Sequence, residues 1–270
     1  MGDTILIKRR LGATDIVLSP VGLGTVKLGR DKGVKYPTGF KIPDDKAATQ
    51  LIALAKALGI NLIDTAPAYG KSEERLGTLL KGQRHDWIIC SKVGEEFDNQ
   101  SGSSSFNFTP EHMRFSVERS LNRLNTDVID ILLVHSDGRD SEIIRRYGIL
   151  EVLNQLKAEG KIRASGMSSK TVAGGLLALE QSDCAMVTYN LNHTEEQPVL
   201  DYAAEHNKGI ILKKALASGH LCREEIADPI QASFDAIFAH PGVTSAIIGT
   251  INPDHLRSNI AKAITAIEAS

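Results

Sequence analysis

Residues 61–92, NLIDTAPAYGKSEERLGTLLKGQRHDWIICSK, contain one complete strand–helix–strand pattern. The runs 61–64 and 87–92 are apolar almost to their last residue, as expected for parallel strands that are buried on both faces. Between them lies a stretch of helical length that begins near Ser72. Parallel strands need a long crossover connection, which is usually a helix. The segment therefore predicts a βαβ unit and an α/β fold.

The same alternation continues along the whole chain. Further strand-like runs lie at 21–25, 129–135, 162–167, 185–190, 209–214 and 245–249. The other helical patterns begin near residues 44, 110, 147, 170, 197, 229 and 253. Eight strand–helix units predict a closed (β/α)8 TIM barrel that spans 1–270 as a single domain. A doubly wound sheet is the alternative, but the GLGT turn at 22–25 lacks the third glycine of its dinucleotide fingerprint.

Composition narrows the class of protein. The chain has 270 residues, of which 42% are hydrophobic, and a net charge of -2, which excludes intrinsic disorder and argues against nucleic-acid binding. Cys90, Cys184 and Cys222 are too scattered for a disulfide framework or a zinc site. We find no signal peptide and no apolar run long enough for a membrane span, so we expect a cytoplasmic protein without membrane partners.

Three successive strand runs end in ionisable residues. They finish in Asp64, Lys92 and His135, and Tyr69 follows the first of them. Each residue alone fits a structural role in a turn, at a strand end or in the core. Barrel active sites lie at the carboxyl ends of the strands, and neighbouring strands are ~4.8 Å apart. We therefore expect the four side chains to meet at one rim.

Together these groups can deliver a proton. A tyrosine has a pKa near ~10, and a neighbouring lysine can lower this value by ~1–3 units. Asp64 can keep Lys92 charged, while His135 can orient a carbonyl oxygen against the Tyr69 hydroxyl. No paired serine or cysteine nucleophile is evident in the sequence. We therefore expect the electrons to come as a hydride from a cofactor.

The stretch 61–77, NLIDTAPAYGKSEERLG, resembles the signature of the aldo-keto reductase family. Ser91-Lys92, residues 130–135, residues 248–250 and Asn259 follow in the family's order. The resemblance implies an NAD(P)H-dependent carbonyl reductase, or a sugar or alcohol dehydrogenase in the reverse direction. It also implies an N-terminal hairpin, here 5–11 and 15–18, that closes the barrel bottom. Tyr69 would be the proton donor.

The resemblance also implies a set of cofactor-binding residues. The nicotinamide would lie near Gly24, Thr25 and Asp64, with its carboxamide at Ser168, Ser169 and Met186. The remaining contacts would come from Lys213, Lys214, Leu216 and Gly219 for the pyrophosphate, and from Gly249, Thr250, Asn252, His255 and Asn259 for the adenosine end. NADP(H) is expected rather than NAD(H), as the family default.

Several of these positions depart from the family pattern. Lys213-Lys214-Ala215-Leu216 stands where Tyr-Ser-Pro-Leu is usual, and His255 stands where an arginine often binds the 2′-phosphate. Strand alternation predicts that only one of Lys213 and Lys214 faces the cofactor. A helix that begins after Asn252 would offer free N–H groups to a phosphate.

Other interpretations remain open at this point. A Schiff-base aldolase would use Lys92 or Lys213 as its nucleophile, and a non-catalytic sensor would bind NADP(H) without turnover. The Ser-, Gly- and Asn-rich segment 94–109 could be a lid or a surface loop. We expect a small aldehyde, ketone or sugar as substrate, and a monomer or small homo-oligomer.

Overall fold

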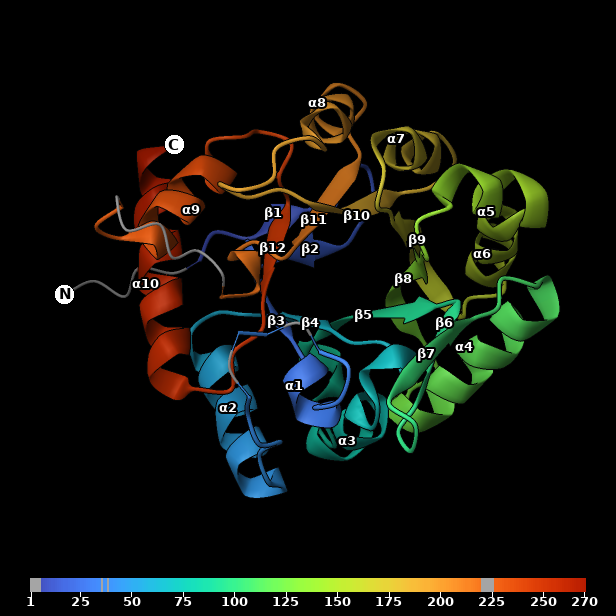
Figure 1. Cartoon of the computed structure of the whole chain (residues 1–270), viewed down its shortest axis with the longest axis horizontal. Helices are drawn as coiled ribbons and strands as arrows, with labels where there is room; N and C mark the ends of the chain where they lie inside the picture. Colours follow the sequence, from blue (N-terminus) through green and yellow to red (C-terminus); the bar gives the residue numbers. More distant parts are fainter. Residues whose placement is uncertain (1–5, 35, 38, 220–225) are drawn as a thin grey trace.

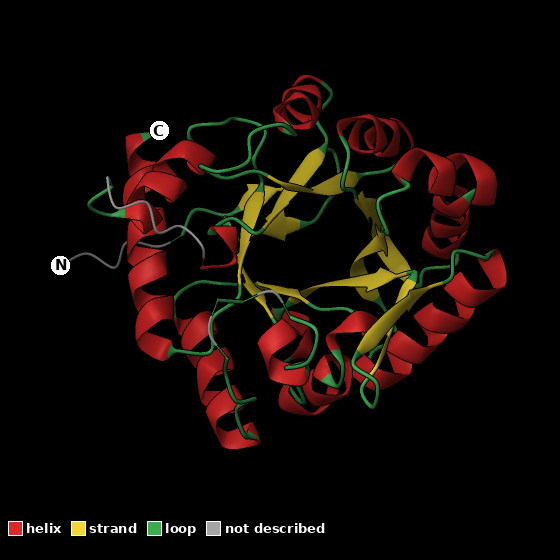
Figure 2. Cartoon of the chain, viewed as in Figure 1, coloured by secondary structure: helices red, strands yellow, loops and turns green. Residues whose placement is uncertain are grey.

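Eight parallel strands close into a barrel in a computed structural model that describes residues 6–34, 36–37, 39–219 and 226–270. Figure 2 shows the ring of strands with helices around it. The strands follow chain order, and the last pairs with the first. They are β3 (Val21–Gly24), β4 (Leu62–Asp64), β5 (Ile88–Val93), β8 (Ile129–His135), β9 (Ile162–Ser168), β10 (Cys184–Thr188), β11 (Gly209–Lys213) and β12 (Ser245–Ile248). The predicted (β/α)8 barrel is confirmed.

The outer helices start close to the predicted positions (Figure 1). They are α2 (Asp45–Ala57), α3 (Ser72–Leu79), α4 (Pro110–Leu124), α6 (Ile149–Ala158), α7 (Val172–Gln181), α8 (Gln197–Glu205), α9 (Pro229–Phe238) and α10 (Pro253–Ala269). The sequence analysis missed the short α1 (Val26–Gly29) and α5 (Asp140–Tyr147). Side chains of Asp44 and Thr109 accept backbone N–H groups at the starts of α2 and α4, as N-caps do. Within the described part of the chain, no helix is both long and apolar enough to cross a membrane.

The N-terminal hairpin closes one end of the barrel. Its strands are β1 (Arg9–Arg10) and β2 (Val17–Leu18), and Figure 1 shows them within the outline of the strand ring. Leu11 and Ile16 pack in the same buried cluster as the inward-facing strand residues. The turn at Gly12 lies so close to the start of β11 that a Cβ there would be 2.7 Å from the Asn207 carbonyl oxygen. The expected hairpin is thus present, although Ile5, the first residue of its predicted strand 5–11, lies outside the described residues. Cys222 also lies outside them.

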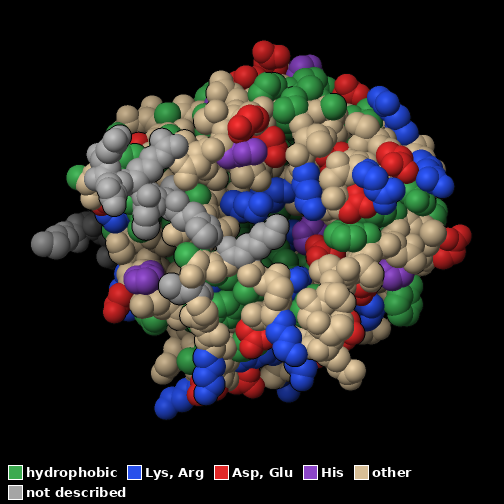
Figure 3. Space-filling view, viewed as in Figure 1, with side chains coloured by type: hydrophobic (Ala, Val, Ile, Leu, Met, Phe, Trp, Pro, Cys, Tyr) green, Lys and Arg blue, Asp and Glu red, His purple; other side chains and the backbone are tan. Residues whose placement is uncertain are grey.

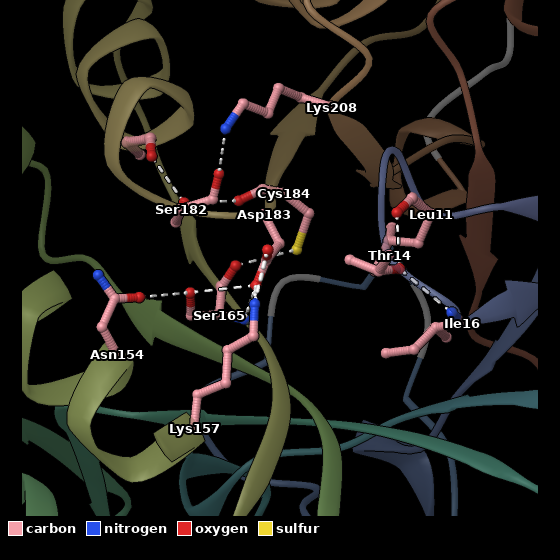
Figure 4. A network of polar contacts seen from close by, with 11 residues as sticks. Leu11, Thr14, Ile16, Asn154, Lys157, Ser165, Ser182, Asp183, Cys184 and Lys208 are labelled. Carbon is pink, nitrogen blue, oxygen red and sulfur yellow. Dashed lines mark hydrogen bonds and ion pairs between the residues drawn. The ribbon is translucent and has the colours of Figure 1, made fainter.

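A polar network ties the strand starts together beside this hairpin (Figure 4). The carboxylate of Asp183 accepts hydrogen bonds from the backbone N–H of Ser165 at 2.9 Å and from Lys157 Nζ at 2.7 Å. Asp183 immediately precedes β10, and Ser165 lies in β9. This network links strands near the amino-terminal end of the barrel. A functional site is expected at the opposite end, where the strands have their carboxyl ends.

The segment 94–109 is not a plain loop. It contains an antiparallel hairpin of β6 (Glu95–Asp98) and β7 (Ser103–Phe106), in which Glu95 pairs with Phe106. The hairpin directly follows β5, so its first residue starts at the carboxyl end of the barrel. Whether it acts as a lid stays a prediction.

Candidate active site

A cavity of about 680 Å³ opens at the carboxyl ends of the strands. In the view along the barrel, Lys, Arg and His side chains gather near the middle of the visible face (Figure 3). Most of the predicted site residues line this cavity: Gly24, Asp64, Tyr69, Lys92, His135, Ser168, Met186, Lys213, Lys214, Leu216, Gly219, Gly249, Thr250, His255 and Asn259. Residues from many separate strand ends therefore converge at one rim.

Lys92 and Asp64 form a buried ion pair at the base of the cavity. Lys92 Nζ lies 2.5 Å from Asp64 Oδ1 and also donates to the Thr65 carbonyl oxygen at 2.9 Å. The two side chains are only 1% and 5% exposed. Burial by itself lowers the pKa of Lys92, but the carboxylate more than offsets this effect, so the pKa is raised. Lys92 is therefore a fixed ammonium.

Tyr69 lies beside this pair at the end of the short 3-10 helix η1 (Pro67–Tyr69). Its hydroxyl donates to Asp64 Oδ2 at 3.3 Å, and Lys92 Nζ lies 4.6 Å from its ring centroid. The expected net lowering of the Tyr69 pKa is wrong. Burial and the charge of Asp64 raise the pKa by more than Lys92 lowers it. Tyr69 is therefore protonated at neutral pH, as a proton donor must be, and the raised pKa makes it a weaker acid than a free phenol.

Close backbone packing sets the position of Tyr69. A Cβ on Gly29 would lie 2.3 Å from the Tyr69 carbonyl oxygen, so only glycine fits there. Nearby, the Ser72 hydroxyl donates to Thr25 Oγ1, which donates in turn to the Asp64 carbonyl oxygen at 2.8 Å. The Thr25 side chain is fully buried in this network and does not line the cavity. The predicted contact of Thr25 with the nicotinamide is therefore wrong. Thr25 instead supports the end of β4 through its hydrogen bond to the Asp64 carbonyl oxygen.

His135 ends β8 and faces Glu95 of β6. Glu95 Oε2 lies 2.9 Å from His135 Nδ1, although it is off the direction of a regular ring N–H hydrogen bond. Burial would raise the pKa of Glu95, but the contacts with His135 and Arg30 hold it at about 2. Burial lowers the pKa of His135, and Glu95 offsets this only in part. Glu95 is therefore a carboxylate at neutral pH, and the pKa of the neighbouring His135 lies below its ordinary value.

Lys213 ends β11 and spans the gap to β9. Its Nζ donates to Ser168 Oγ at 3.0 Å and also to the Ser169 carbonyl oxygen. Burial lowers the pKa of Lys213 to about 8, even though Glu196 acts in the opposite direction. The Ser169 side chain lies outside the cavity lining, with its hydroxyl against Gly175 of α7. The predicted contact between the Ser169 side chain and the carboxamide is therefore wrong.

Lys213 and Lys214 both line the cavity, contrary to the expectation from strand alternation. The reason is local: β11 ends at Lys213, and Lys214 has a φ of 53°. This left-handed conformation breaks the alternation that a strand would impose. Which of the two ammonium groups faces a cofactor stays a prediction.

The N-terminus of α10 lies at the far end of the cavity. Thr250, His255 and Asn259 line this end, but Asn252 does not. Instead, Asn252 Oδ1 caps α10 by accepting the backbone N–H groups of Asp254 at 2.8 Å and His255 at 3.3 Å. The expectation of free N–H groups for a phosphate is therefore wrong, because the helix's own cap uses two of them.

Sequence reasoning also missed some lining residues. Glu95, Arg30 and Tyr36 all border the cavity. Glu95 could have been found, since it follows the end of β5 by two residues and barrel active sites use such positions. Tyr36 gives no sequence signal of this kind, because it lies in an irregular segment between α1 and α2.

A (β/α)8 barrel with a tyrosine hydroxyl beside a lysine–aspartate pair defines an oxidoreductase of carbonyl and alcohol groups. The comparisons agree: the Aldo/keto reductase family model matches residues 20–237. The chain belongs to the aldo/keto reductase family, whose members use nicotinamide cofactors. This membership favours the oxidoreductase over the aldolase interpretation.

Individual relatives support the assignment. A Pseudomonas aeruginosa crystal structure assigned as an aldo-keto reductase is 56% identical, with a TM-score of 0.87, over 96% of this chain and 95% of that one. L-galactose dehydrogenase of Arabidopsis thaliana is 32% identical over 80% of this chain and 67% of its own length. NADH-specific methylglyoxal reductase of Escherichia coli is 37% identical over 59% of this chain and 51% of its own.

Proposed function

We propose that this enzyme interconverts small aldehydes, ketones or sugars with their alcohols, with Tyr69 as the proton donor in reduction. The observation that carries this proposal is the contact of the Tyr69 hydroxyl with a buried ammonium–carboxylate pair at the cavity base. A proton donor must lie where negative charge develops on the substrate oxygen. The fixed charge of Lys92, 4.6 Å from the Tyr69 ring centroid, stabilises that negative charge.

The residues of the cavity fit a nicotinamide dinucleotide. Lys213 and Lys214 offer cations for a pyrophosphate, and Gly249 leaves room for close approach to the backbone at the cavity wall. Ser168 has its Oγ held by Lys213, so its hydroxyl proton is free to donate to a carboxamide. When bound, the reduced nicotinamide supplies the hydride. The chain's own residues position the carbonyl and provide the proton.

NADP(H) remains our preferred cofactor. We propose that His255 takes the place of the arginine that often binds the 2′-phosphate. His255 lines the adenosine end of the cavity. An arginine would bind a phosphate in bidentate fashion, which histidine cannot do. We therefore propose weak discrimination between NADPH and NADH. We also propose action in the cytoplasm as a monomer or small homo-oligomer, which size-exclusion chromatography would test.

The activity test is a panel of aldehydes, ketones and sugars followed through nicotinamide absorbance. Tyr69→Phe should reduce kcat by a factor of about 10²–10⁴, the contribution of a positioned general acid. Its cofactor affinity should stay unchanged. Tyr147→Phe is the matched control, since Tyr147 lies at the end of α5 and outside the cavity lining. Full activity of Tyr69→Phe would refute the assignment of the proton donor.

A further inference from the structure

Glu95 is a carboxylate of the cavity wall to which no described group donates a regular hydrogen bond. Among the described lining residues only Asp64 and Glu95 are acidic, and Asp64 is committed to its ion pair with Lys92. His135 Nδ1 lies 2.9 Å from Glu95 Oε2 but off the direction of a regular hydrogen bond. The Ser104 hydroxyl lies near enough to lower the pKa of Glu95, yet no hydrogen bond of regular geometry joins the two side chains. The Glu95 oxygens therefore keep free acceptor capacity.

Arg30 supplies a counter-charge to Glu95 but no hydrogen bond. Its Nη1 lies 3.9 Å from Glu95 Oε1, beyond hydrogen-bond distance. The guanidinium instead donates to backbone carbonyl oxygens, at 2.9 Å to Lys32 and Ala68 and at 3.1 Å to Gly33. These bonds hold Arg30 in place. The charge of Glu95 is therefore partly balanced, while its lone pairs still lack a donor from the described residues.

The carboxylate lies away from residues that we propose for the cofactor. Glu95 follows β5, which lies directly opposite β11 in the ring of strands. Ser168 and Lys213, proposed for the carboxamide and the pyrophosphate, belong to β9 and β11. Glu95 instead contacts His135, which lies edge-on to Tyr69 with 6.4 Å between the ring centroids. It is therefore within reach of groups on the carbons next to a carbonyl bound at these two rings.

A carboxylate can only accept hydrogen bonds, so a ligand beside Glu95 must bring the donor. Only 14% of the side chain is exposed, and a largely buried acceptor without a donor is costly. We propose that Glu95 is a substrate-binding residue that accepts a hydrogen bond from a hydroxyl group close to the reacting carbonyl, so that the enzyme prefers neutral hydroxyaldehydes and hydroxyketones, including open-chain sugars. This inference rests on the proposed function and narrows its substrate class.

The charges beside Glu95 favour a neutral substrate. An ammonium group at this place would also meet the Arg30 guanidinium, 3.9 Å from the carboxylate. A substrate carboxylate or phosphate would meet Glu95 itself. A hydroxyl group avoids both repulsions and gains a charge-assisted hydrogen bond, which is about twice as strong as a neutral one. Glu95 thus selects for one kind of substituent and against another.

The kinetic test uses two aldehydes with the same three-carbon chain. D-glyceraldehyde carries two hydroxyl groups and propanal carries none, and kcat/KM is expressed per free aldehyde. The wild-type ratio of the two values should favour D-glyceraldehyde, and Glu95→Ala should lower this ratio about 10- to 100-fold, the loss of one hydrogen bond to a charged group. Glu95→Gln keeps one acceptor oxygen and should retain part of the preference. A merely structural role of Glu95 would lower both values alike and leave the ratio unchanged.

A second pair of aldehydes tests the charge. Succinic semialdehyde and butanal share a four-carbon chain, but only the first ends in a carboxylate. Glu95→Gln should raise the ratio of their kcat/KM values about tenfold in favour of the anion, because it removes a negative charge and leaves Arg30 unbalanced. Glu96→Gln is the matched control on the same strand. Glu96 pairs with Arg119 outside the cavity lining, so both ratios should keep their wild-type values.

The binding of alcohols gives a measurement that does not depend on turnover. With NADPH as the added cofactor an alcohol has no hydride acceptor, so glycerol and 1-propanol can be compared as ligands by saturation-transfer NMR. The wild type should bind glycerol, and Glu95→Ala should lose most of this signal while Glu96→Gln keeps it. An unchanged aldehyde ratio or an unchanged glycerol signal in Glu95→Ala overturns the inference. Failure of the proposed function would appear separately, as no turnover of any carbonyl in the panel by the wild type.

Discussion

The buried ion pair between Lys92 and Asp64 gives the sharpest test of the site's energetics. Asp64→Asn keeps the side-chain size and removes the negative charge. The Lys92 ammonium would then be left nearly inaccessible, with the Thr65 carbonyl oxygen as the remaining partner that we observe. Removing one member of a buried pair costs about 3–5 kcal/mol, because it strands an uncompensated charge.

A loss of this size is a large fraction of the roughly 5–15 kcal/mol that stabilises most domains. It should lower Tm by roughly 10 °C in a chain of this length. Urea unfolding monitored by circular dichroism would measure it. As a control, Asp86→Asn breaks the Lys56–Asp86 pair, whose side chains are 48% and 33% exposed, and should leave the stability nearly unchanged.

The double variant Asp64→Asn/Lys92→Met separates charge from packing. It removes both charges, so it should be less destabilised than the sum of the two single variants, with a coupling of about 2 kcal/mol. If the single losses instead add to within about 0.5 kcal/mol, the two charges are not coupled, and the account of Lys92 as a fixed ammonium fails.

Three further predictions concern the rim of the cavity. Lys213 is mostly an ammonium below pH 8 and an amine above it. The affinity for NADPH, measured by calorimetry, should therefore fall about tenfold from pH 7 to 9. Lys213→Met should abolish this pH dependence. His255→Arg should raise the preference for NADPH over NADH about tenfold, measured as a ratio of Kd values. Gly29→Ala should cost about 1–3 kcal/mol in urea unfolding and lower kcat, because its Cβ would displace Tyr69. Gly39→Ala is the control, since a Cβ there meets no atom of the described residues within 4 Å and should do neither.

The strand–helix alternation could be predicted from the sequence because each strand of the barrel is buried on both faces. Such runs are nearly continuous in apolar residues, and the eight of them matched the observed strands to within one or two residues at each end. The convergence of Asp64, Lys92 and His135 followed from topology alone, since every parallel strand of a closed barrel ends at the same rim. Neither inference needed side-chain detail.

The sequence predictions failed where the local geometry of the chain determines what a side chain contacts. The left-handed φ of Lys214 and the cap formed by Asn252 depend on how a strand or helix terminates, which periodicity does not encode. The raised pKa of Tyr69 depends on how far burial outweighs one nearby cation, and a sequence carries no measure of burial depth at a rim.

Glu95 shows how these two kinds of information combine. Topology places it at the reactive rim, three residues beyond Lys92, but only the hairpin β6–β7 turns its carboxylate toward His135. The hairpin in segment 94–109 thus places a carboxylate beside His135, a contact that strand periodicity alone does not predict.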